Sequence, residues 1–186
     1  MNSRSFIFLF FVSVTLCSHS PQASAVARSF QLSVQTSSPF SIALDNLQSQ
    51  IDYTFESIGL LRRAMTHASY SEENNKALSV LGGRLIEASA ALQLLTKNVD
   101  ISTKDLNRLI VEIDNVENSC SADGTHLGLQ KIVRVSSKTN STSPAVVCSA
   151  FRAIFGAIAV DTGSLDEARS VFWKVHKGGF GRAVAM

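Results

Sequence analysis

The chain has 186 residues, of which 45% are hydrophobic and 17% are charged. This length suits one domain with terminal extensions, and the apolar fraction is sufficient for a hydrophobic core. With 17 basic and 15 acidic residues and a net charge of +2, the composition excludes a strong overall attraction to nucleic acid or to an anionic membrane.

Residues 1–25 have the pattern of a secretory signal peptide. Arg4 supplies a positive charge, residues 6–17 form the apolar run FIFLFFVSVTLC, and ASA at 23–25 supplies small residues for a signal peptidase. The run is shorter than the roughly 20 residues of a membrane span. We therefore predict cleavage after Ala25, no stable membrane anchor after cleavage, and a location in the endoplasmic reticulum lumen or outside the cell. The alternatives are an uncleaved anchor and an organelle transit peptide.

The next segment, 26–40, is rich in serine and lacks a sustained period, so we predict that it is a linker. From Ser41 onward, apolar residues recur at helical spacing. The first predicted helix is short and amphipathic and covers 41–51. The second covers 57–67, and Ser57 is available to cap its first turn.

The third predicted helix, over 75–97, contains an unexpected pair of glycines. Its apolar stripe is formed by Leu78, Leu81, Leu85 and Leu92. Gly82 and Gly83 interrupt this stripe, and each costs roughly 1 kcal/mol relative to alanine in a helix interior. Local helix propensity therefore does not account for the pair.

A fourth helix is predicted to begin after Ser102, because Asp105 three positions later has capping-box spacing. Its apolar residues are Leu106, Leu109, Ile110 and Ile113. A shorter helix is predicted over 118–127. The segment GLQKIVRV, at 128–135, is ambiguous between helix and strand.

Two further helices follow. Ser143 caps a helix whose first residue is Pro144, a favoured position for proline. Ser164 and Glu167 have capping-box spacing at the start of the last helix, which covers 165–177.

These elements predict an all-α domain of about seven helices over 41–177, with little or no strand. A short tail, 178–186, follows it. Gly178 and Gly179 at the start of this tail are typical of residues that end a helix.

The chain has three cysteines, and Cys17 would leave with the signal peptide. The remaining two, Cys120 and Cys148, favour a disulfide, because an even number in an oxidising compartment is typical of one. The alternative is a pair of buried, reduced thiols. The two cysteines do not form a CxxC motif, so we expect no redox role.

One sequon for N-glycosylation is present, Asn140-Ser141-Thr142. It lies in SSKTNSTSP, a polar stretch that is typical of an exposed loop. We therefore predict a glycan on Asn140, although sequons also occur by chance.

Three blocks of the sequence resemble a known family. LLRRAMTHASY, NNKALSVLGGRLIEA and FRAIFGAIAVDTG occur in the order and at the spacing of the ribonuclease III domain, whose blocks are ALTHxSY, NERLEFLGD and DxxEALIGAIYLD. The resemblance covers roughly 44–177 and implies a ribonuclease III-like helical bundle. It also implies cleavage of double-stranded RNA by clustered carboxylates that hold a divalent metal ion.

In this chain the family's acidic positions carry no acid. They fall on Lys76, Ser79, Gly83, Ser149 and Arg152, and an accessory glutamate falls near Thr103. Two of these residues are cationic and would repel a divalent cation. The resemblance therefore implies the fold without the metal site, and we expect no metal, no other cofactor and no catalytic residue.

Other acids could replace the lost ones only if the fold brought them together. The candidates are Glu87, Asp114, Glu117 and Asp161. None repeats the spacing of the family, so we predict that they are solvated surface charges or helix caps.

Several other polar and aromatic residues are predicted to be structural. His67 lies in a block that is structural in the family, and Phe172 and Trp173 are expected to belong to the core. Arg62 and Arg63 are too few to form an RNA-binding stripe. Two further histidines have no identifiable partner in the sequence, His126 and His176.

The resemblance also bears on cysteine pairing and on assembly. It places Cys120 and Cys148 on two helices of one bundle, so we expect them to be joined. Family members dimerise through an aromatic residue of the second block, and Val80 occupies that position here. Because valine is smaller, a homodimer would have a weaker anchor.

The leading hypothesis is a catalytically inactive ribonuclease III-like protein of the secretory pathway that binds or scaffolds an unidentified protein partner. The alternative is an active or partner-assisted double-stranded RNA endoribonuclease in ribosomal RNA processing. A third hypothesis is an RNA-binding module without cleavage, which salt-dependent binding of duplex RNA would support.

Overall fold

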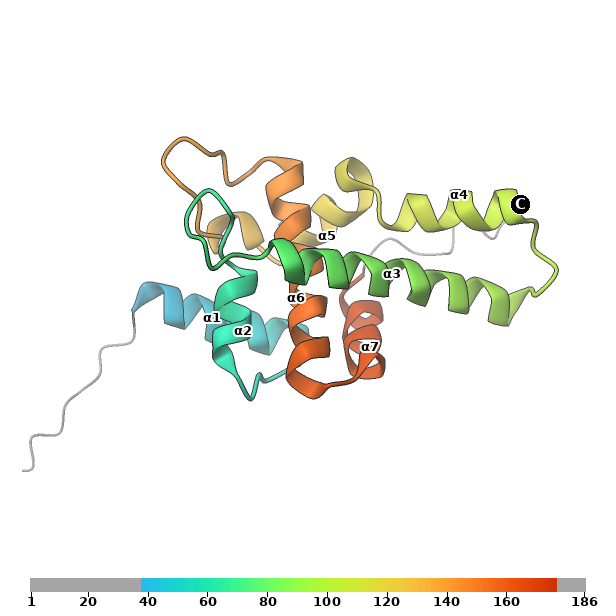
Figure 1. Ribbon diagram of the computed structural model, residues 1–186, viewed down its shortest axis with the longest axis horizontal. Helices are drawn as coiled ribbons and strands as arrows, with labels where there is room; N and C mark the ends of the chain where they lie inside the picture. Colours follow the sequence, from blue (N-terminus) through green and yellow to red (C-terminus); the bar gives the residue numbers. More distant parts are fainter. Residues whose placement is uncertain (1–37, 177–186) are drawn as a thin grey trace, which may run out of the picture. The chain divides into compact units, whose positions relative to one another are not determined.

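The computed structural model describes residues 38–176, which form seven α-helices, one π-helical turn and one 3₁₀ turn (Figure 1). The predicted signal peptide, nearly all of the predicted linker, and the C-terminal tail with Gly178 and Gly179 lie outside the described residues. Within 38–176 the only extended pairing is an isolated parallel bridge between Thr66 and Arg134. The prediction of an all-α domain is confirmed.

The first two helices have different caps at their N-termini. Helix α1, Pro39–Ile51, begins two residues before the predicted start, because the Ser38 hydroxyl accepts a hydrogen bond from the Ser41 amide. Helix α2, Ile58–Ala64, follows Ser57, but the Ser57 side chain makes no capping bond. The helix ends three residues before the predicted end.

Helices α3, Lys76–Lys97, and α4, Thr103–Ile113, form a hairpin that extends away from the other helices (Figure 1). The bounds of α3 match the prediction to within one residue. At the start of α4, the Ser102 hydroxyl accepts from the Asp105 amide, which confirms the predicted cap. The Asp105 carboxylate accepts from the Ser102 hydroxyl rather than from the Ser102 amide that a full capping box uses.

The segment after α4 is less regular than predicted. The expected helix over 118–127 is divided into a π-helical turn, η1, Val116–Cys120, and helix α5, Ser121–His126. The ambiguous segment 128–135 contains the 3₁₀ turn η2, Leu129–Lys131, and then the bridge from Arg134. It is therefore neither a regular α-helix nor a strand of a sheet.

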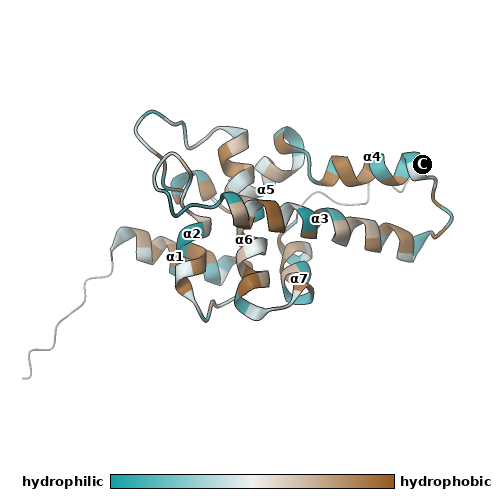
Figure 2. Cartoon of the chain, in the orientation of Figure 1, coloured by the Kyte–Doolittle hydropathy of each residue, from teal (hydrophilic) through white to brown (hydrophobic). Residues whose placement is uncertain are grey.

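Helix α6, Pro144–Thr162, is the central helix of the domain, and it contacts α2, α3, α5 and α7. Ser143 caps it as predicted, by accepting a hydrogen bond from the Val146 amide. The hydropathy colours of Figure 2 show its apolar character. By length and composition, α3 and α6 would each be able to cross a membrane. In this domain, however, 44% of the most apolar part of α3 and 67% of that of α6 are buried.

Helix α7, Leu165–Val175, packs against α6 and closes the aromatic core. Phe172 makes edge-to-face contacts with Phe151 and Phe155 of α6, with ring centroids 6.4 and 5.4 Å apart. The neighbouring Trp173 donates its indole N–H to the Ser89 hydroxyl of α3 at 2.7 Å. The prediction that Phe172 and Trp173 belong to the core is confirmed.

The C-terminal end of α7 is held by a buried pair of polar side chains. His176 Nδ1 and Asp123 Oδ2 of α5 lie 2.6 Å apart, and both side chains are at most 5% exposed. No local pattern identified a partner for His176, because Asp123 is 53 residues away along the chain.

Cys120 and Cys148 form a disulfide, with their Cα atoms 5.0 Å apart. The bond joins η1 to α6, and both residues are buried. The predicted pairing is therefore confirmed, and the alternative of two reduced thiols is not observed.

Candidate functional site

Two of the family's acidic positions, Gly83 and Arg152, lie where α3 crosses α6, and this crossing is unusually close. A Cβ atom added to Gly82 would lie 1.8 Å from the carbonyl oxygen of Arg152, and one added to Gly156 would lie 2.0 Å from the carbonyl oxygen of Leu78. The two backbones are therefore in direct contact, and only glycine fits at these positions. Gly82 is thus explained by helix packing.

Gly83 has a different environment. A Cβ atom here would meet Arg152 Cδ at 3.4 Å and the Asp114 carboxylate at 3.9 Å, which are ordinary contact distances. The backbone therefore does not require glycine at this position. The space beside Gly83, toward which an aspartate would project, is taken by the Arg152 side chain.

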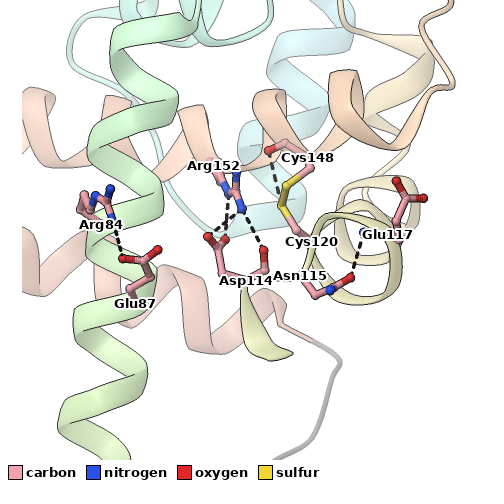
Figure 3. A network of polar contacts seen from close by, with 8 residues as sticks. All are labelled: Arg84, Glu87, Asp114, Asn115, Glu117, Cys120, Cys148 and Arg152. Atoms are coloured by element: carbon pink, nitrogen blue, oxygen red, sulfur yellow. Dashed lines mark hydrogen bonds and ion pairs between the residues drawn. A yellow bond between two sulfur atoms is a disulfide. The ribbon is translucent and has the colours of Figure 1, made fainter. Parts of the chain in front are cut away.

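Arg152 and Asp114 form a forked ion pair at this place (Figure 3). Arg152 Nε donates to Asp114 Oδ1 at 2.8 Å, and Nη2 donates to Oδ2 at 2.7 Å and to the Asp114 carbonyl at 2.8 Å. The two side chains are 24% and 11% exposed. Two parallel bonds of this kind fix both the position and the plane of the guanidinium.

Burial raises the pKa of Asp114, and the hydrogen bonds and charge of Arg152 offset this effect only in part. The prediction that Asp114 is a solvated surface charge is wrong. Asp114 does occupy the C-cap position of α4, but its carboxylate is turned into the domain and paired. The 38 residues between Asp114 and Arg152 hid this pairing from the sequence.

The other candidate acids have structural roles or lie at the surface. Glu87 pairs with Arg84 on α3, with atoms 2.8 Å apart, and both side chains are more than a third exposed. Glu117 is exposed in η1. Asp161 caps α2, because its carboxylate accepts from the amides of Glu56 and Ser57. The cap and surface assignments of these three acids are confirmed.

The environment of Asp161 fits this capping role. Partial burial acts to raise its pKa, but hydrogen bonds from Ser57, Tyr53 and Glu56 outweigh burial and lower the pKa below its usual value. Its carboxylate thus stays ionised at neutral pH.

The remaining family positions supply no ligand at the crossing. Ser79 and Ser149 lie one helical turn before Gly83 and Arg152 and are half-buried, and Lys76 is exposed at the start of α3. Among residues 38–176 no three His, Cys, Asp or Glu side chains are grouped so that they could hold a metal ion. The donor set at the crossing, one paired carboxylate and one guanidinium, does not fit a divalent metal.

Thr103, near which the accessory glutamate of the family falls, is the exposed first residue of α4. The carboxylate that reaches the crossing comes from Asp114 at the opposite end of that helix.

The THASY block is a structural loop. The Thr66 carbonyl accepts from the Asn75 amide, and the His67 amide donates to the Arg134 carbonyl. The His67 ring nitrogen Nδ1 accepts from the Ser69 amide at 3.1 Å. This agrees with the prediction that His67 is structural.

Sequence reasoning missed Arg134, which organises the same region. Its guanidinium lies over the rings of Phe40 and Tyr70, at 4.4 and 4.9 Å from their centroids. Arg62 also lies over Phe40, and Arg63 donates to the Asn74 carbonyl. The three arginines therefore make cation–π contacts or hydrogen bonds within the domain, which hold this region together.

Comparisons with known proteins place this geometry in context. The family model described as Ribonuclease-III-like matches residues 57–176. The chain is 59% identical over 150 residues to the protein NUCLEAR FUSION DEFECTIVE 2 of Arabidopsis thaliana, and the match covers 81% of this chain and 78% of that protein.

More distant relatives are bacterial. The chain is 31% identical over 141 residues to Ribonuclease 3 of Phenylobacterium zucineum, of which it spans 58%. Among solved structures, the nuclease domain of ribonuclease III from Campylobacter jejuni matches with a TM-score of 0.68 at 23% identity, over 74% of this chain and 99% of that one. That structure is described as flexible in a region involved in dimer formation.

Proposed function

This chain belongs to the ribonuclease-III-like family, and on that basis we propose that it is a member without nuclease activity that acts by binding or scaffolding in nuclear fusion (karyogamy). The link to nuclear fusion rests on the name of the Arabidopsis relative, with which it shares 59% identity. The bacterial ribonucleases are about half as similar, and the chain spans less than two thirds of the first of them.

The ion pair between Arg152 and Asp114 is the observation that supports the absence of nuclease activity in this proposal. The family's reaction needs several carboxylates that converge on divalent metal. Here a fixed guanidinium lies beside Gly83, and it binds both carboxylate oxygens of Asp114. A divalent ion at this place would face a like charge and would have no free carboxylate as ligand.

We also propose that the protein is located in the secretory pathway. The disulfide between Cys120 and Cys148 supports this location, because such bonds persist in oxidising compartments. The endoplasmic reticulum is continuous with the nuclear envelope, so a luminal protein would be well placed to act when nuclei fuse.

One face of α3 is suited to binding a second copy of the chain. Its exposed apolar side chains, which we call the α3 stripe, are Val80, Leu81, Leu92 and Leu95, with exposures from 36% to 67%. Val80 is the most exposed of them. Arg84 and Glu87 lie between the two ends of the stripe, and opposite charges here would complement those of a second copy. We propose this face as a homodimer interface.

A nuclease assay tests the inactive part of the proposal. The purified mature chain would be incubated with long duplex RNA and with magnesium or manganese, with EDTA as the control. We expect the background rate with either metal. Cleavage that copurifies with the chain and disappears with EDTA would instead support the double-stranded RNA endoribonuclease alternative.

A complementation test addresses nuclear fusion. Plants that lack the Arabidopsis relative would receive this chain, and nuclear fusion would be scored by microscopy. We expect rescue by the wild-type chain and also by Lys76→Ala, because no charge at that family position is needed. Absence of rescue by a chain that accumulates and is correctly located would contradict the nuclear-fusion role.

A further inference from the structure

The loop between the Arg134 bridge and α6 is ordered by its own hydrogen bonds. The Ser136 amide donates to the Ser69 hydroxyl, and the hydroxyls of Ser136 and Thr139 lie 3.1 Å apart. The Ser143 amide donates to the Asn140 carbonyl just before α6 begins. Asn140 therefore has a defined position in this loop, and it is exposed.

The two atoms of the Asn140 side-chain amide have different environments. Oδ1 accepts two hydrogen bonds from Thr142, one from its amide at 2.9 Å and one from its hydroxyl at 2.8 Å. Nδ2 makes no hydrogen bond within residues 38–176. The oxygen is thus held by the third residue of the sequon, while the nitrogen is free and faces water.

From this arrangement we propose that Asn140 Nδ2 is an acceptor for N-linked glycosylation. The donor would be an oligosaccharide linked to a lipid pyrophosphate. A bond forms between Nδ2 and the anomeric carbon of the sugar, the bond from that carbon to the pyrophosphate oxygen breaks, Nδ2 loses one proton, and the lipid pyrophosphate leaves. Neither the bond that forms nor the bond that breaks involves Oδ1, which accepts both hydrogen bonds from Thr142. We therefore expect the folded loop to accommodate the glycan.

The position of the loop determines which surface the glycan covers. The loop and the far end of the α3 and α4 hairpin lie at opposite ends of the domain (Figure 1). A glycan on Asn140 therefore covers the end near the THASY block and leaves the outer part of the α3 stripe, with Leu92 and Leu95, open to a partner. Glycosylation of the natural protein rests on the proposed secretory location.

The chain contains a matched site that lacks only the sequon. In Asn98-Val99-Asp100, the Asp100 amide donates to Asn98 Oδ1 at 3.0 Å, and Asn98 is exposed. This is the same type of turn as at Asn140, but Asp100 stands where a sequon has serine or threonine. Asp100→Thr therefore completes a second sequon in a similar turn, and it serves as a positive control for the assay.

The full chain would be made in a eukaryotic secretory host, once with its own residues 1–25 and once with these replaced by the signal peptide of a known secreted protein. Treatment with an endoglycosidase, followed by gel electrophoresis, reports the glycan. We expect one glycan on the wild-type chain, its loss in Asn140→Gln and Thr142→Ala, its retention in Thr142→Ser, and a second glycan in Asp100→Thr.

The two arms separate this proposal from the proposed location. If Asp100→Thr gains a glycan in the arm with the known signal peptide but Asn140 remains bare, the acceptor proposal is overturned, whatever the native location. If Asn140 is glycosylated only in that arm, the acceptor proposal is supported and the secretory location is contradicted. The start of the mature chain at Val26, found by N-terminal sequencing, reports the location independently.

Discussion

Gly82 of α3 lies directly against the carbonyl of Arg152 in α6, so that a Cβ atom at Gly82 would be 1.8 Å from that oxygen. A Cβ atom added to the next residue, Gly83, would have Arg152 Cδ as its nearest neighbour, at 3.4 Å. Helix packing therefore requires glycine at position 82 but not at position 83. Substitution of the two glycines should have different effects on stability.

Gly82→Ala should destabilise the domain, because α3 and α6 would have to separate at their crossing. We expect a loss of about 3 kcal/mol, at the upper end of overpacking effects. Gly83→Ala should be neutral or should stabilise by up to about 1 kcal/mol through helix propensity. Urea unfolding followed by circular dichroism measures both. Equal effects of the two substitutions would contradict this account of the crossing.

Arg152→Ala should destabilise the domain by about 2 kcal/mol at neutral pH, because it leaves the Asp114 carboxylate partly buried without its partner. The double variant Arg152→Met with Asp114→Leu removes both charges and should recover most of the loss. Comparison of their unfolding midpoints tests whether the unpaired charge is the cause.

The effect of Arg152→Ala should also depend on pH. Burial raises the pKa of Asp114 in the folded state above its value in the unfolded chain. Protonation of Asp114 therefore favours the folded state. This stabilisation is fully present below the unfolded pKa and is lost as pH rises through the folded pKa. Without Arg152 that pKa should rise further. The stability difference from wild type should therefore shrink as pH falls from 7 toward 4, and a constant difference would contradict this.

Replacement of both Cys120 and Cys148 by alanine should reduce stability by about 3 kcal/mol, because the bond closes a loop with a sequence separation of 28. A reducing agent should lower the melting temperature of the wild type but not of the variant. Mass spectrometry under non-reducing conditions checks the bond directly, and two free thiols in the chain purified from a secretory host would sink the prediction.

Val80→Glu should weaken dimerisation, because Val80 is 67% exposed in the α3 stripe. Val111→Glu is a matched control on α4, since Val111 is 65% exposed outside the stripe. Analytical ultracentrifugation over a range of concentrations should show a dimer for the wild type and for Val111→Glu, and a shift to monomer for Val80→Glu. A wild type that stays monomeric throughout would refute the proposed interface.

Gly83→Asp alone should not produce nuclease activity, because a single carboxylate beside Arg152 would pair with the guanidinium rather than with a metal ion. Acids at all five family positions, Lys76, Ser79, Gly83, Ser149 and Arg152, would remove that guanidinium and could bind metal together. We expect magnesium to raise the melting temperature of the five-site variant, and to leave the melting temperatures of the wild type and of Gly83→Asp unchanged.

The sequence by itself determined the all-α class, the long helices and the absence of acids at the family's positions, but not the irregular segment after α4. The bounds of α3 and the caps of α4 and α6 were predictable, because apolar periodicity and capping act between residues at most four positions apart. The disulfide also followed from the sequence, since only two cysteines remained to pair once Cys17 was assigned to the signal peptide.

Tertiary structure alone decided which distant residues meet. Asp161 rather than the Ser57 hydroxyl caps α2, Asp114 neutralises Arg152, and Asp123 holds His176. Each of these partners is 38 or more residues away, so no local pattern distinguishes it from other acids of the chain. The close crossing of α3 and α6 has the same origin: the sequence shows two similar glycines, and only the approach of a second helix makes one of them indispensable.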